Sequence, residues 1–317
     1  MGISVNEVNA NSRGGTELLI DEFNERIPTS LSDHFQIIPS RFRGFEPGKI
    51  AIYWAHDLPG DPECDHLKNG GYNQYERIVF VSNWQMQAFI NYYGIPWYKC
   101  IVIHNAIVPV ENKPRSKDKI KLIYHTTPHR GLELLAPVFD KLCEKYDNIE
   151  LDVFSSFKMY GWEERDQVYS EVFEMLKNNP KVRYHGFGDY HTVRSALSDA
   201  HIFAYPSIWP ETGCRSLMEA MSAGVLSVHS NYGCLHETAA AWTWMYQYSE
   251  DKREHAQTFY QHLDAAIANY WNESVQSRLA SQSSYANVFY NWEMRKHQWI
   301  SLLRMILDRK GIKYDVA

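Results

Sequence analysis

Two glutamates, Glu211 and Glu219, flank a short polar segment in the sequence WPETGCRSLMEAMSAG, residues 209–224. Carboxylates bind hydroxyl groups well, because a hydroxyl donates strongly to a charged acceptor. The segment between the acids begins with Thr212, Gly213, Cys214, Arg215 and Ser216, which Leu217 and Met218 follow. It offers backbone N–H groups at an expected helix N-terminus, where phosphate binds readily; Gly213 permits close approach and Arg215 adds positive charge. The pattern is typical of a site for a phosphate joined to sugars on both sides, as in a nucleotide sugar.

The same two acids have two other interpretations. On one continuous helix, eight positions would separate them by roughly 12 Å. That exceeds the roughly 5 to 9.5 Å between the two carboxyl groups of most glycoside hydrolases, so the spacing disfavours a general acid and base pair. Two solvated charges on an ordinary crossover helix are the other alternative.

The elements around these acids are a strand, a turn and a helix. HIFAYPS, residues 201–207, is an apolar run typical of a strand, and the prolines at 206 and 210 prevent its continuation. The apolar spacing from Leu217 to Met221 predicts a helix that ends at Gly224. Glu211 is therefore expected in the loop at the carboxyl end of a strand, and Glu219 a turn or two into the following helix.

Composition excludes several classes of function. The chain has 317 residues, of which 44% are hydrophobic and 22% charged, enough for two globular domains. With a net charge of −6 and no long basic run, nucleic acid is not an expected partner. Five scattered cysteines favour reduced thiols in a cytoplasmic protein over a disulfide framework. No stretch approaches the ~18 apolar residues of a membrane span, although peripheral membrane contact stays open.

Short apolar runs alternate with helical periodicity, which predicts an α/β protein with two doubly wound, Rossmann-like parallel sheets. Residues 1–108 form the first domain, with strands expected at 3–8, 35–40, 49–55, 77–82 and 100–105 and helices at 14–27 and 82–94. Residues 109–119 are polar and contain Pro114, which indicates a linker.

The second predicted domain covers residues 120–290 and is more regular. Its strands are expected at 121–125, 149–155, 182–187, 201–207 and 225–230, with helices at 131–146, 164–178 and 190–200 between them. From about residue 250 the pattern is helical. Residues 291–317 form a C-terminal helix with a glycine stop at Gly311, and packing back on the first domain is one arrangement for it. Two such domains in tandem predict a ligand cleft between them.

With these motifs in place, the chain resembles the GT-B glycosyltransferases of glycosyltransferase family 4, which are retaining and use sugar nucleotides. The resemblance is carried by FAYPSIWPETGCRSLMEAMSAGVLSV (203–228), YHTTPHRGLELL (124–135), IVFVSNWQMQAFINYYGIP (78–96), IVIHNAI (101–107) and RGGTELL (13–19). It implies a GT-B fold, with a nucleotide-sugar donor bound mainly by the second domain. UDP-sugar is preferred over GDP-sugar, and the acceptor, whether glycan, lipid or small molecule, is not identified.

The resemblance also implies roles for single residues. Glu219 would bind the ribose hydroxyls, Glu211 the transferred sugar, and Arg130 the diphosphate leaving group. His56, in YWAHDLPG, would face the donor sugar near the reacting carbon. The remaining donor-binding residues would be the segment 212–216 together with Gly14, Gly15, Thr16, Thr126, Thr127, Gly186 and Phe187. Of these, Gly186 and Phe187 would lie beside the base.

Some of these positions have plainer interpretations, and some depart from the family pattern. The glycines at 14 and 15 also fit a plain turn, and His56 a structural histidine. A second basic residue is usual before the position of Arg130, where this chain has His125, Thr126 and Thr127, and Ala106 replaces a usual glycine. The first domain is also short.

Metal chemistry is not expected. The acids, histidines and cysteine of HDLPGDPECDH, residues 56–66, match no standard zinc spacing, and its prolines and glycine predict a loop. No Asp-x-Asp sequence occurs in the chain. The sequence thus predicts a retaining, metal-independent hexosyltransferase without a cofactor. The alternatives are a nucleotide-sugar 2-epimerase and a catalytically silent nucleotide-sugar-binding subunit.

Overall fold

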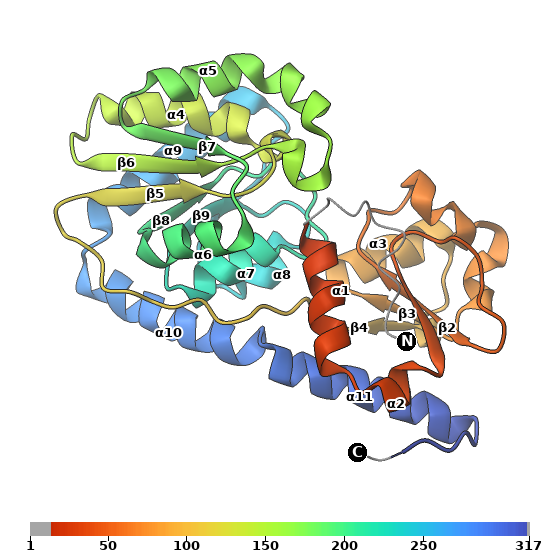
Figure 1. Cartoon of the computed structure of the whole chain (residues 1–317). Helices are drawn as coiled ribbons and strands as arrows, with labels where there is room; N and C mark the ends of the chain where they lie inside the picture. Colours follow the sequence, from red (N-terminus) through yellow and green to blue (C-terminus); the bar gives the residue numbers. More distant parts are fainter. Residues whose placement is uncertain (1–13, 316–317) are drawn as a thin grey trace. The chain divides into compact units, whose positions relative to one another are not determined.

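The structure, a computed structural model, describes residues 14–315. The chain forms two compact units, the first made of Met1–Ala106 with Tyr290–Ala317 and the second of Ile107–Phe289. Both are α/β units built on parallel sheets, which confirms the predicted fold class (Figure 1). The strand expected at 3–8 lies outside the described residues. Residues 109–119 contain no helix or strand and belong to the second unit.

The first unit has a parallel sheet whose described strands run in chain order. These strands are β1 (Phe35–Pro39), β2 (Ile50–Ala55), β3 (Arg77–Phe80) and β4 (Cys100–Val102). Alternate side chains of a strand point to opposite faces. In β2, Trp54 enters the hydrophobic core on one face, and Tyr53 enters the core on the other. The sheet is therefore buried on both faces, as expected for parallel strands.

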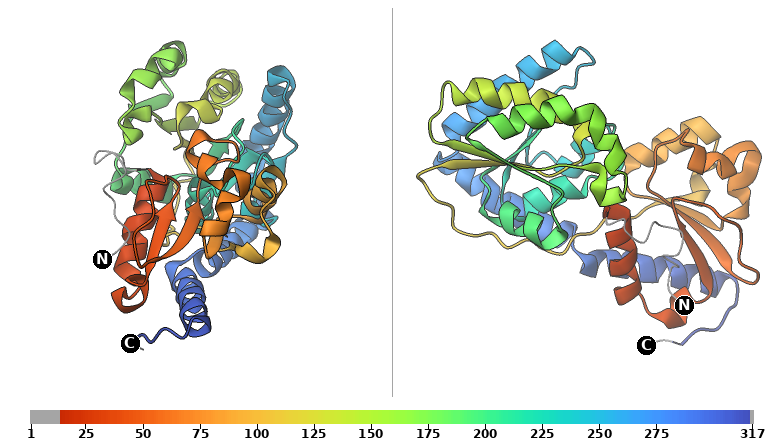
Figure 2. Two further views of the ribbon diagram at one scale, coloured as in Figure 1. Left: turned by 90° about the vertical axis from the view of Figure 1, so that its right-hand side faces the viewer. Right: turned by 45° about the horizontal axis from the view of Figure 1, so that its top comes forward.

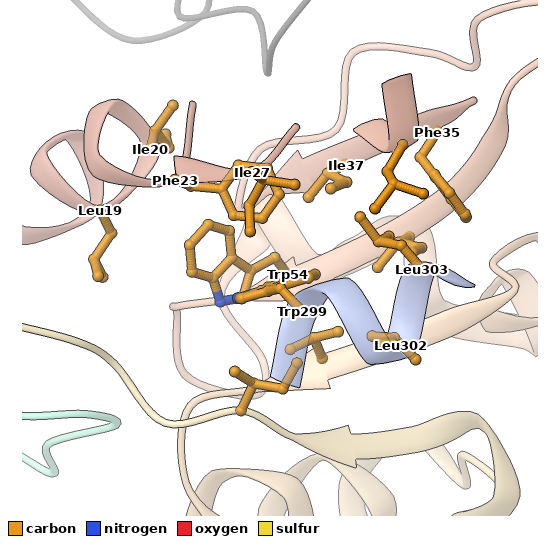
Figure 3. Close-up of a cluster of buried hydrophobic side chains, with 14 of the residues drawn as sticks. Leu19, Ile20, Phe23, Ile27, Phe35, Ile37, Trp54, Trp299, Leu302 and Leu303 are labelled. Atoms are coloured by element: carbon orange, nitrogen blue, oxygen red, sulfur yellow. The ribbon is translucent and has the colours of Figure 1, made fainter. Parts of the chain in front are cut away.

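One face of this sheet is covered by helices from both ends of the chain. They are α1 (Gly15–Arg26), α2 (Thr29–Ser32) and α11 (Trp292–Arg309). Figure 3 shows Phe23 of α1 and Trp299 of α11 packed together on Trp54 of β2. The Trp299 ring centroid lies 5.1 Å from that of Phe23 and 5.0 Å from that of Trp54. The C-terminal helix is therefore part of the first unit's core.

The other face is covered by α3 (Asn83–Tyr93) and by η2 (Pro62–Gln74), a series of 3₁₀ turns. A loop was the prediction for residues 56–66, and it is wrong from Pro62 onward. The physical reason is local. Asp61 accepts a hydrogen bond from the Glu63 amide and caps the turn, while proline at the first helical position has no N–H that needs a partner. Cys64 and Leu67 then bury their side chains in the core.

The second unit contains a parallel sheet of order β10-β9-β8-β5-β6-β7 among the described residues. Its strands are β5 (Ile120–Tyr124), β6 (Ile149–Phe154), β7 (Val182–Gly186), β8 (Ile202–Tyr205), β9 (Leu226–Ser230) and β10 (Trp244–Tyr246). The chain starts in the middle at β5, builds outward to β7, and then returns to β8 on the other side of β5. The order therefore reverses between β5 and β8, the point where doubly wound sheets bind ligands.

Helices lie on both faces of this second sheet (Figures 1 and 2). One layer contains α4 (Leu132–Cys143), α5 (Ser170–Asn178) and α9 (Lys252–Asn269). The opposite layer contains α6 (Tyr190–Asp199), α7 (Arg215–Ser222) and α8 (Leu235–Ala239), and α10 (Glu273–Phe289) packs on α7. The helix expected at 164–178 begins only at Ser170, because Asp166 accepts from the Phe157 amide and holds the preceding 3₁₀ turns. No helix of the described chain is long and apolar enough to cross a membrane.

Candidate active site

Two loops meet at the carboxyl edge of the second sheet, at the point where the strand order reverses. One leaves β5 after Tyr124 and the other leaves β8 after Tyr205. The two loops are in contact at Gly131. Its φ is +117°, and a Cβ there would lie 2.1 Å from the carbonyl oxygen of Pro206. Only glycine allows this approach, so the HRG sequence brings Arg130 directly against the β8 loop.

Replacement of Gly131 with alanine is expected to destabilise the second unit by about 2 kcal/mol or more, through backbone strain and the contact with Pro206. The matched control is Gly186→Ala, where φ is +63° but the nearest atom, on Tyr184, is 4.0 Å away. Strain alone predicts a loss of about 1 kcal/mol for the control. Urea unfolding of both variants checks the difference, and equal losses would show that the Pro206 contact is unimportant.

The centre of the site is an ion pair between the two loops. Nη1 of Arg130 lies 2.5 Å from Oε1 of Glu211, and the hydroxyl of Tyr205 donates to the same oxygen. The Glu211 side chain is only 5% exposed. Burial alone would lower the pKa of Arg130, but the Glu211 carboxylate raises it well above its usual value. A permanent positive charge is therefore held at the switch point of the sheet.

Several polar atoms of the loops at this carboxyl edge are buried without a partner in the part of the chain that the structure describes. They include Nε of Arg130, Oγ1 of Thr127 and Oγ of Ser155. Ser155 follows the carboxyl end of β6 directly, and Thr127 lies in the β5 loop. Buried polar groups in native proteins usually have partners, so unmatched ones clustered at a sheet's carboxyl edge indicate a place for a polar ligand.

The backbone of Glu211 is fixed by a neighbouring loop. Its carbonyl oxygen accepts a hydrogen bond of 2.7 Å from the Cys234 amide, and Glu211 pairs with Gly233 in an isolated β-bridge. A Cβ on Gly233 would lie 2.3 Å from the Glu211 nitrogen. The carboxylate thus projects from a backbone that the Gly233 and Cys234 segment holds, which keeps its position before any ligand binds.

Glu219 lies in α7 and is also buried. The hydroxyl of Tyr190 donates to its Oε1 over 3.2 Å, and guanidinium nitrogens of Arg215 and Arg194 lie 3.6 and 3.8 Å from the same oxygen. Arg215 was expected to add charge at the phosphate position, but its side chain is 8% exposed and turned to Glu219. Arg194 also donates to the carbonyl of Pro109 over 2.7 Å.

The segment between the two acids has the predicted form. α7 begins at Arg215, after Thr212, Gly213 and Cys214, and the side chain of its N-cap residue Cys214 makes no capping hydrogen bond. Ser216 is its second residue. Burial, with the nearby Glu211 carboxylate, raises the pKa of the Cys214 thiol well above its usual range, so this thiol is neutral. The positive end of the α7 dipole thus lies directly after the loop that carries Glu211, and such an end favours an anion.

The two histidines of the β5 loop do not supply a second positive charge. Burial lowers the pKa of both His125 and His129 to about 4. His129 stacks on Phe157, with ring centroids 5.3 Å apart, and meets the Trp209 ring edge-on at 4.7 Å. At neutral pH both imidazoles are uncharged, so Arg130 is the charged residue of this loop. Thr126, like Thr127, is buried there.

Gly186 and Phe187 lie at the carboxyl end of β7. Gly186 has φ +63°, which glycine adopts easily, and the Phe187 side chain is 40% exposed. Beside them His185 stacks on Phe154, with ring centroids 4.2 Å apart. An exposed aromatic ring at this edge offers a surface on which a flat base could stack.

The remaining predicted residues lie in the first unit. α1 begins at Gly15, followed by Thr16, and Gly14 precedes it with φ −74°, a value open to any residue. His56 follows β2 directly, and its ring centroid is 4.8 Å from that of Trp54. In the segment 56–66, Cys64 pairs with the hydroxyl of Tyr53, and His66 with that of Tyr75. No group of three potential metal-ligating side chains is found within residues 14–315.

Sequence reasoning missed three residues that contact the two acids. Tyr205 binds Glu211, while Tyr190 and Arg194 approach Glu219. Tyr205 had a usable signal, because it precedes the proline that interrupts the predicted strand 201–207, and the loop after that strand carries Glu211. Tyr190 and Arg194 are four residues apart on one helix, the spacing of side chains that share a face, but nothing in the sequence shows that this face meets α7.

A comparison with protein families matches residues 105–278, more than half of the chain, to the family described as glycosyl transferases group 1. Among curated proteins, the chain is similar to a human subunit of phosphatidylinositol N-acetylglucosaminyltransferase, with 28% identity over 141 residues, which are 43% of this chain and 28% of the human protein. It is similar to the Saccharomyces cerevisiae phosphatidylinositol N-acetylglucosaminyltransferase GPI3 subunit, with 25% identity over 51% of this chain and 37% of the yeast protein. The matches thus span about a third of the length of these relatives.

Solved structures share the fold. A glycosyltransferase from Rickettsia africae superposes with a TM-score of 0.69 at 14% identity, covering 95% of this chain and 84% of the other. Anabaena HepE in complex with UDP-glucose superposes with a TM-score of 0.62, also at 14% identity, covering 81% of this chain and 72% of the other. At such identities the likeness is one of architecture.

Proposed function

The chain belongs to the glycosyl transferases group 1 and is a glycosyltransferase, and from this premise we propose that it moves a hexose from a nucleotide diphosphate sugar to an acceptor hydroxyl. The transfer proceeds with retention of configuration and without a metal ion. The observation that carries the proposal is the buried Arg130 and Glu211 pair at the switch point between β5 and β8. We assign the diphosphate to Arg130 and the hexose to Glu211.

The geometry of the pair supports this division of roles. Breaking the bond between the sugar and the nucleotide leaves negative charge on the diphosphate, and a fixed positive charge in a buried site stabilises it strongly. Arg130 supplies that charge, together with the amino end of α7. Both side-chain contacts of Glu211 use Oε1, and Oε2 is the oxygen that we assign to a hydroxyl of the hexose.

The reaction follows a short sequence of bond changes. The acceptor hydroxyl approaches the sugar C1 on the face from which the diphosphate departs, the bond from C1 to the phosphate oxygen breaks, and the new glycosidic bond forms. The leaving phosphate oxygen takes the acceptor proton, so no separate base is required. His56 is assigned to the sugar beside the reacting carbon, in the first unit. This part of the proposal rests on the family resemblance.

UDP-sugars are the favoured donors. The Anabaena structure contains UDP-glucose, and the human relative is named for N-acetylglucosamine transfer, so both sugars belong in the first donor panel, with GDP-mannose for comparison. The acceptor is a hydroxyl on a glycan, a lipid or a small molecule. The five free cysteines favour a reducing compartment, and we place the enzyme in the cytoplasm.

Glu219→Ala is expected to weaken the binding of free UDP by roughly 10- to 100-fold, because the ribose loses a charged hydrogen-bond acceptor. Isothermal titration calorimetry measures this directly. Glu219→Gln keeps the side chain's shape and should show a smaller loss. Glu171→Ala, at an exposed position of α5, is the matched control and should bind UDP as the unchanged protein does. Unchanged affinity in Glu219→Ala would remove this residue from the donor site.

The donor panel tests the proposed reaction against its two alternatives. The purified protein is incubated with each nucleotide sugar, with and without simple glycoside acceptors, and the products are identified by chromatography and NMR. Release of the nucleoside diphosphate with transfer or slow hydrolysis of the sugar is the expected result. An altered sugar still attached to its nucleotide would show an epimerase, and binding without turnover of any donor would favour a silent binding subunit.

A further inference from the structure

A polar cavity lies at the opposite edge of the first unit's sheet from His56. It has a volume of about 410 Å³ and opens beside the amino ends of β3 and β4. Its lining includes Gln74, Glu76, Arg77, Tyr98, Lys99 and Arg309. These residues come from the end of η2, the start of β3, the short 3₁₀ helix η3 (Trp97–Lys99) and the end of α11. Since His56 follows the carboxyl end of β2, the cavity is separate from the residue assigned to the sugar.

The charge of this cavity is opposite to that of the whole chain. The lining contains three cationic side chains and one acid, whereas the chain carries a net charge of −6. Glu76 faces three cations. Arg309 contacts its Oε1, Arg77 lies 3.5 Å from the same oxygen, and Lys310 lies 3.0 Å from Oε2. One carboxylate cannot neutralise them all, so positive charge is left over.

Lys99 adds to this excess. Its ammonium donates to the carbonyl oxygens of Tyr75, over 2.7 Å, and Asn73, over 3.3 Å, which hold the group in place but carry no net charge. Burial lowers the pKa of Lys99, and the nearby Arg77 acts in the same direction, while Glu76 opposes them. An anion entering the cavity would relieve the repulsion between these cations.

Aromatic rings stand beside the cations. Tyr98 lines the cavity and is 58% exposed, and its neighbour Trp97 is 79% exposed, the largest fraction among the large exposed aromatic side chains of the described chain. An indole ring normally buries much of its surface, so one this exposed is informative. The site thus combines several N–H donors with an adjoining apolar ring surface.

We propose that this cavity binds a phosphate group, carried on a ligand whose remaining part lies against Tyr98 and Trp97. The planar guanidinium groups of Arg77 and Arg309 match phosphate oxygens, and the two lysines act as point charges beside them. Glu76 orders the cations and is not a ligand. The inference does not rest on the proposed transfer reaction. The phosphate has two sources, a soluble phosphate ester or a lipid headgroup, and the experiment separates them.

The test compares the 317-residue protein with R309Q/K310Q, which removes two positive charges at exposed ends of the cluster. Lys313→Gln, a few residues further on and exposed, changes one charge outside the cavity and is the control. Glycerol phosphate, titrated by NMR, probes the soluble source. Vesicles of phosphatidylcholine, with and without phosphatidic acid, probe the lipid source by sedimentation.

We expect binding of at least one phosphate probe, weakened roughly tenfold in R309Q/K310Q and unchanged in Lys313→Gln. If vesicles are the source, Trp97→Ala should also reduce sedimentation, and the tryptophan emission should shift to shorter wavelength on binding. If R309Q/K310Q loses its far-ultraviolet circular dichroism, the single variants Arg309→Gln and Lys310→Gln provide the same comparison. Failure of both phosphate probes to bind the unchanged protein, or an equal loss in the control, would overturn the proposal.

Discussion

Arg130→Gln is expected to lower the rate of sugar transfer by roughly 10²- to 10³-fold, the usual cost of removing a group that stabilises charge in a transition state. The physical reason is that Arg130 is the charged residue of the β5 loop, where His125 and His129 are uncharged at neutral pH. No neighbouring side chain of that loop can replace its charge against the departing diphosphate. Steady-state kinetics with the preferred UDP-sugar measures the effect.

The matched control for this variant is Arg253→Gln, which removes a guanidinium from an exposed position of α9. Its rate should equal that of the unchanged enzyme. Arg130→Gln should lose more in kcat than in affinity for the donor, because the leaving group gains its full charge only as the bond breaks. A rate within about threefold of the unchanged enzyme would contradict the role of Arg130.

Glu211→Leu is expected to destabilise the protein by about 3 kcal/mol, because it leaves the Arg130 charge buried without its partner. The hydroxyl of Tyr205, which is fully buried, loses its acceptor at the same time. Turnover should fall by at least 10²-fold, since the hexose loses the carboxylate that holds it. Urea unfolding and donor kinetics measure the two effects separately.

The double variant Arg130→Met/Glu211→Leu distinguishes structure from function at this pair. Replacing a buried ion pair by apolar side chains of similar size is often neutral for stability. We therefore expect most of the lost stability to return in the double variant, while activity stays absent. If activity returned together with stability, the pair would have a structural role only. If Glu211→Leu were as stable as the unchanged protein, the pair would be less buried than the structure shows.

Much of the fold could be predicted because the strands of a parallel sheet are buried on both faces, so each one is a continuous apolar run in the sequence. The expected ranges 35–40, 77–82 and 201–207 contain β1, β3 and β8. β10 was not predicted, because the three residues Trp244–Tyr246 are flanked by polar residues; β4 is as short, but its apolar run continues to Ile103. For α11, packing on the first domain was one arrangement that the sequence left open. An apolar stripe that includes Trp299 shows that a helix packs, but not on which sheet.

The candidate site was predictable to the extent that it depends on loops following strands. Arg130 and Glu211 were each expected at the carboxyl end of a strand, and the sheet order places those two strands side by side. Their direct ion pair was not predicted, because side-chain contact across 81 positions depends on tertiary packing. Arg215 illustrates the same limit. Its position in the helix was expected, but its contact with Glu219 follows from the rotamer, which sequence does not show.

The first unit shows where local pattern misleads. Prolines and a glycine in residues 56–66 are common in loops, but Pro62 begins a 3₁₀ helix instead. Its acids, histidines and cysteine bind separate partners, as Cys64 does with Tyr53. The cavity at Lys99 and Arg309 could not be predicted from the sequence, because tertiary folding brings these residues together from 210 positions apart.

The central claim is that the second unit holds a nucleotide sugar at Arg130 and Glu211 and breaks its bond to the phosphate. Proton NMR of the anomeric signals, followed in time after the enzyme is mixed with UDP-glucose or UDP-N-acetylglucosamine, tests it most directly. We predict release of UDP, a new sugar signal that first appears with the donor's α configuration, and growth of that signal slowed by roughly 10²- to 10³-fold in Arg130→Gln. An unchanged donor spectrum with every UDP- and GDP-sugar, or equal release by Arg130→Gln, would contradict the claim.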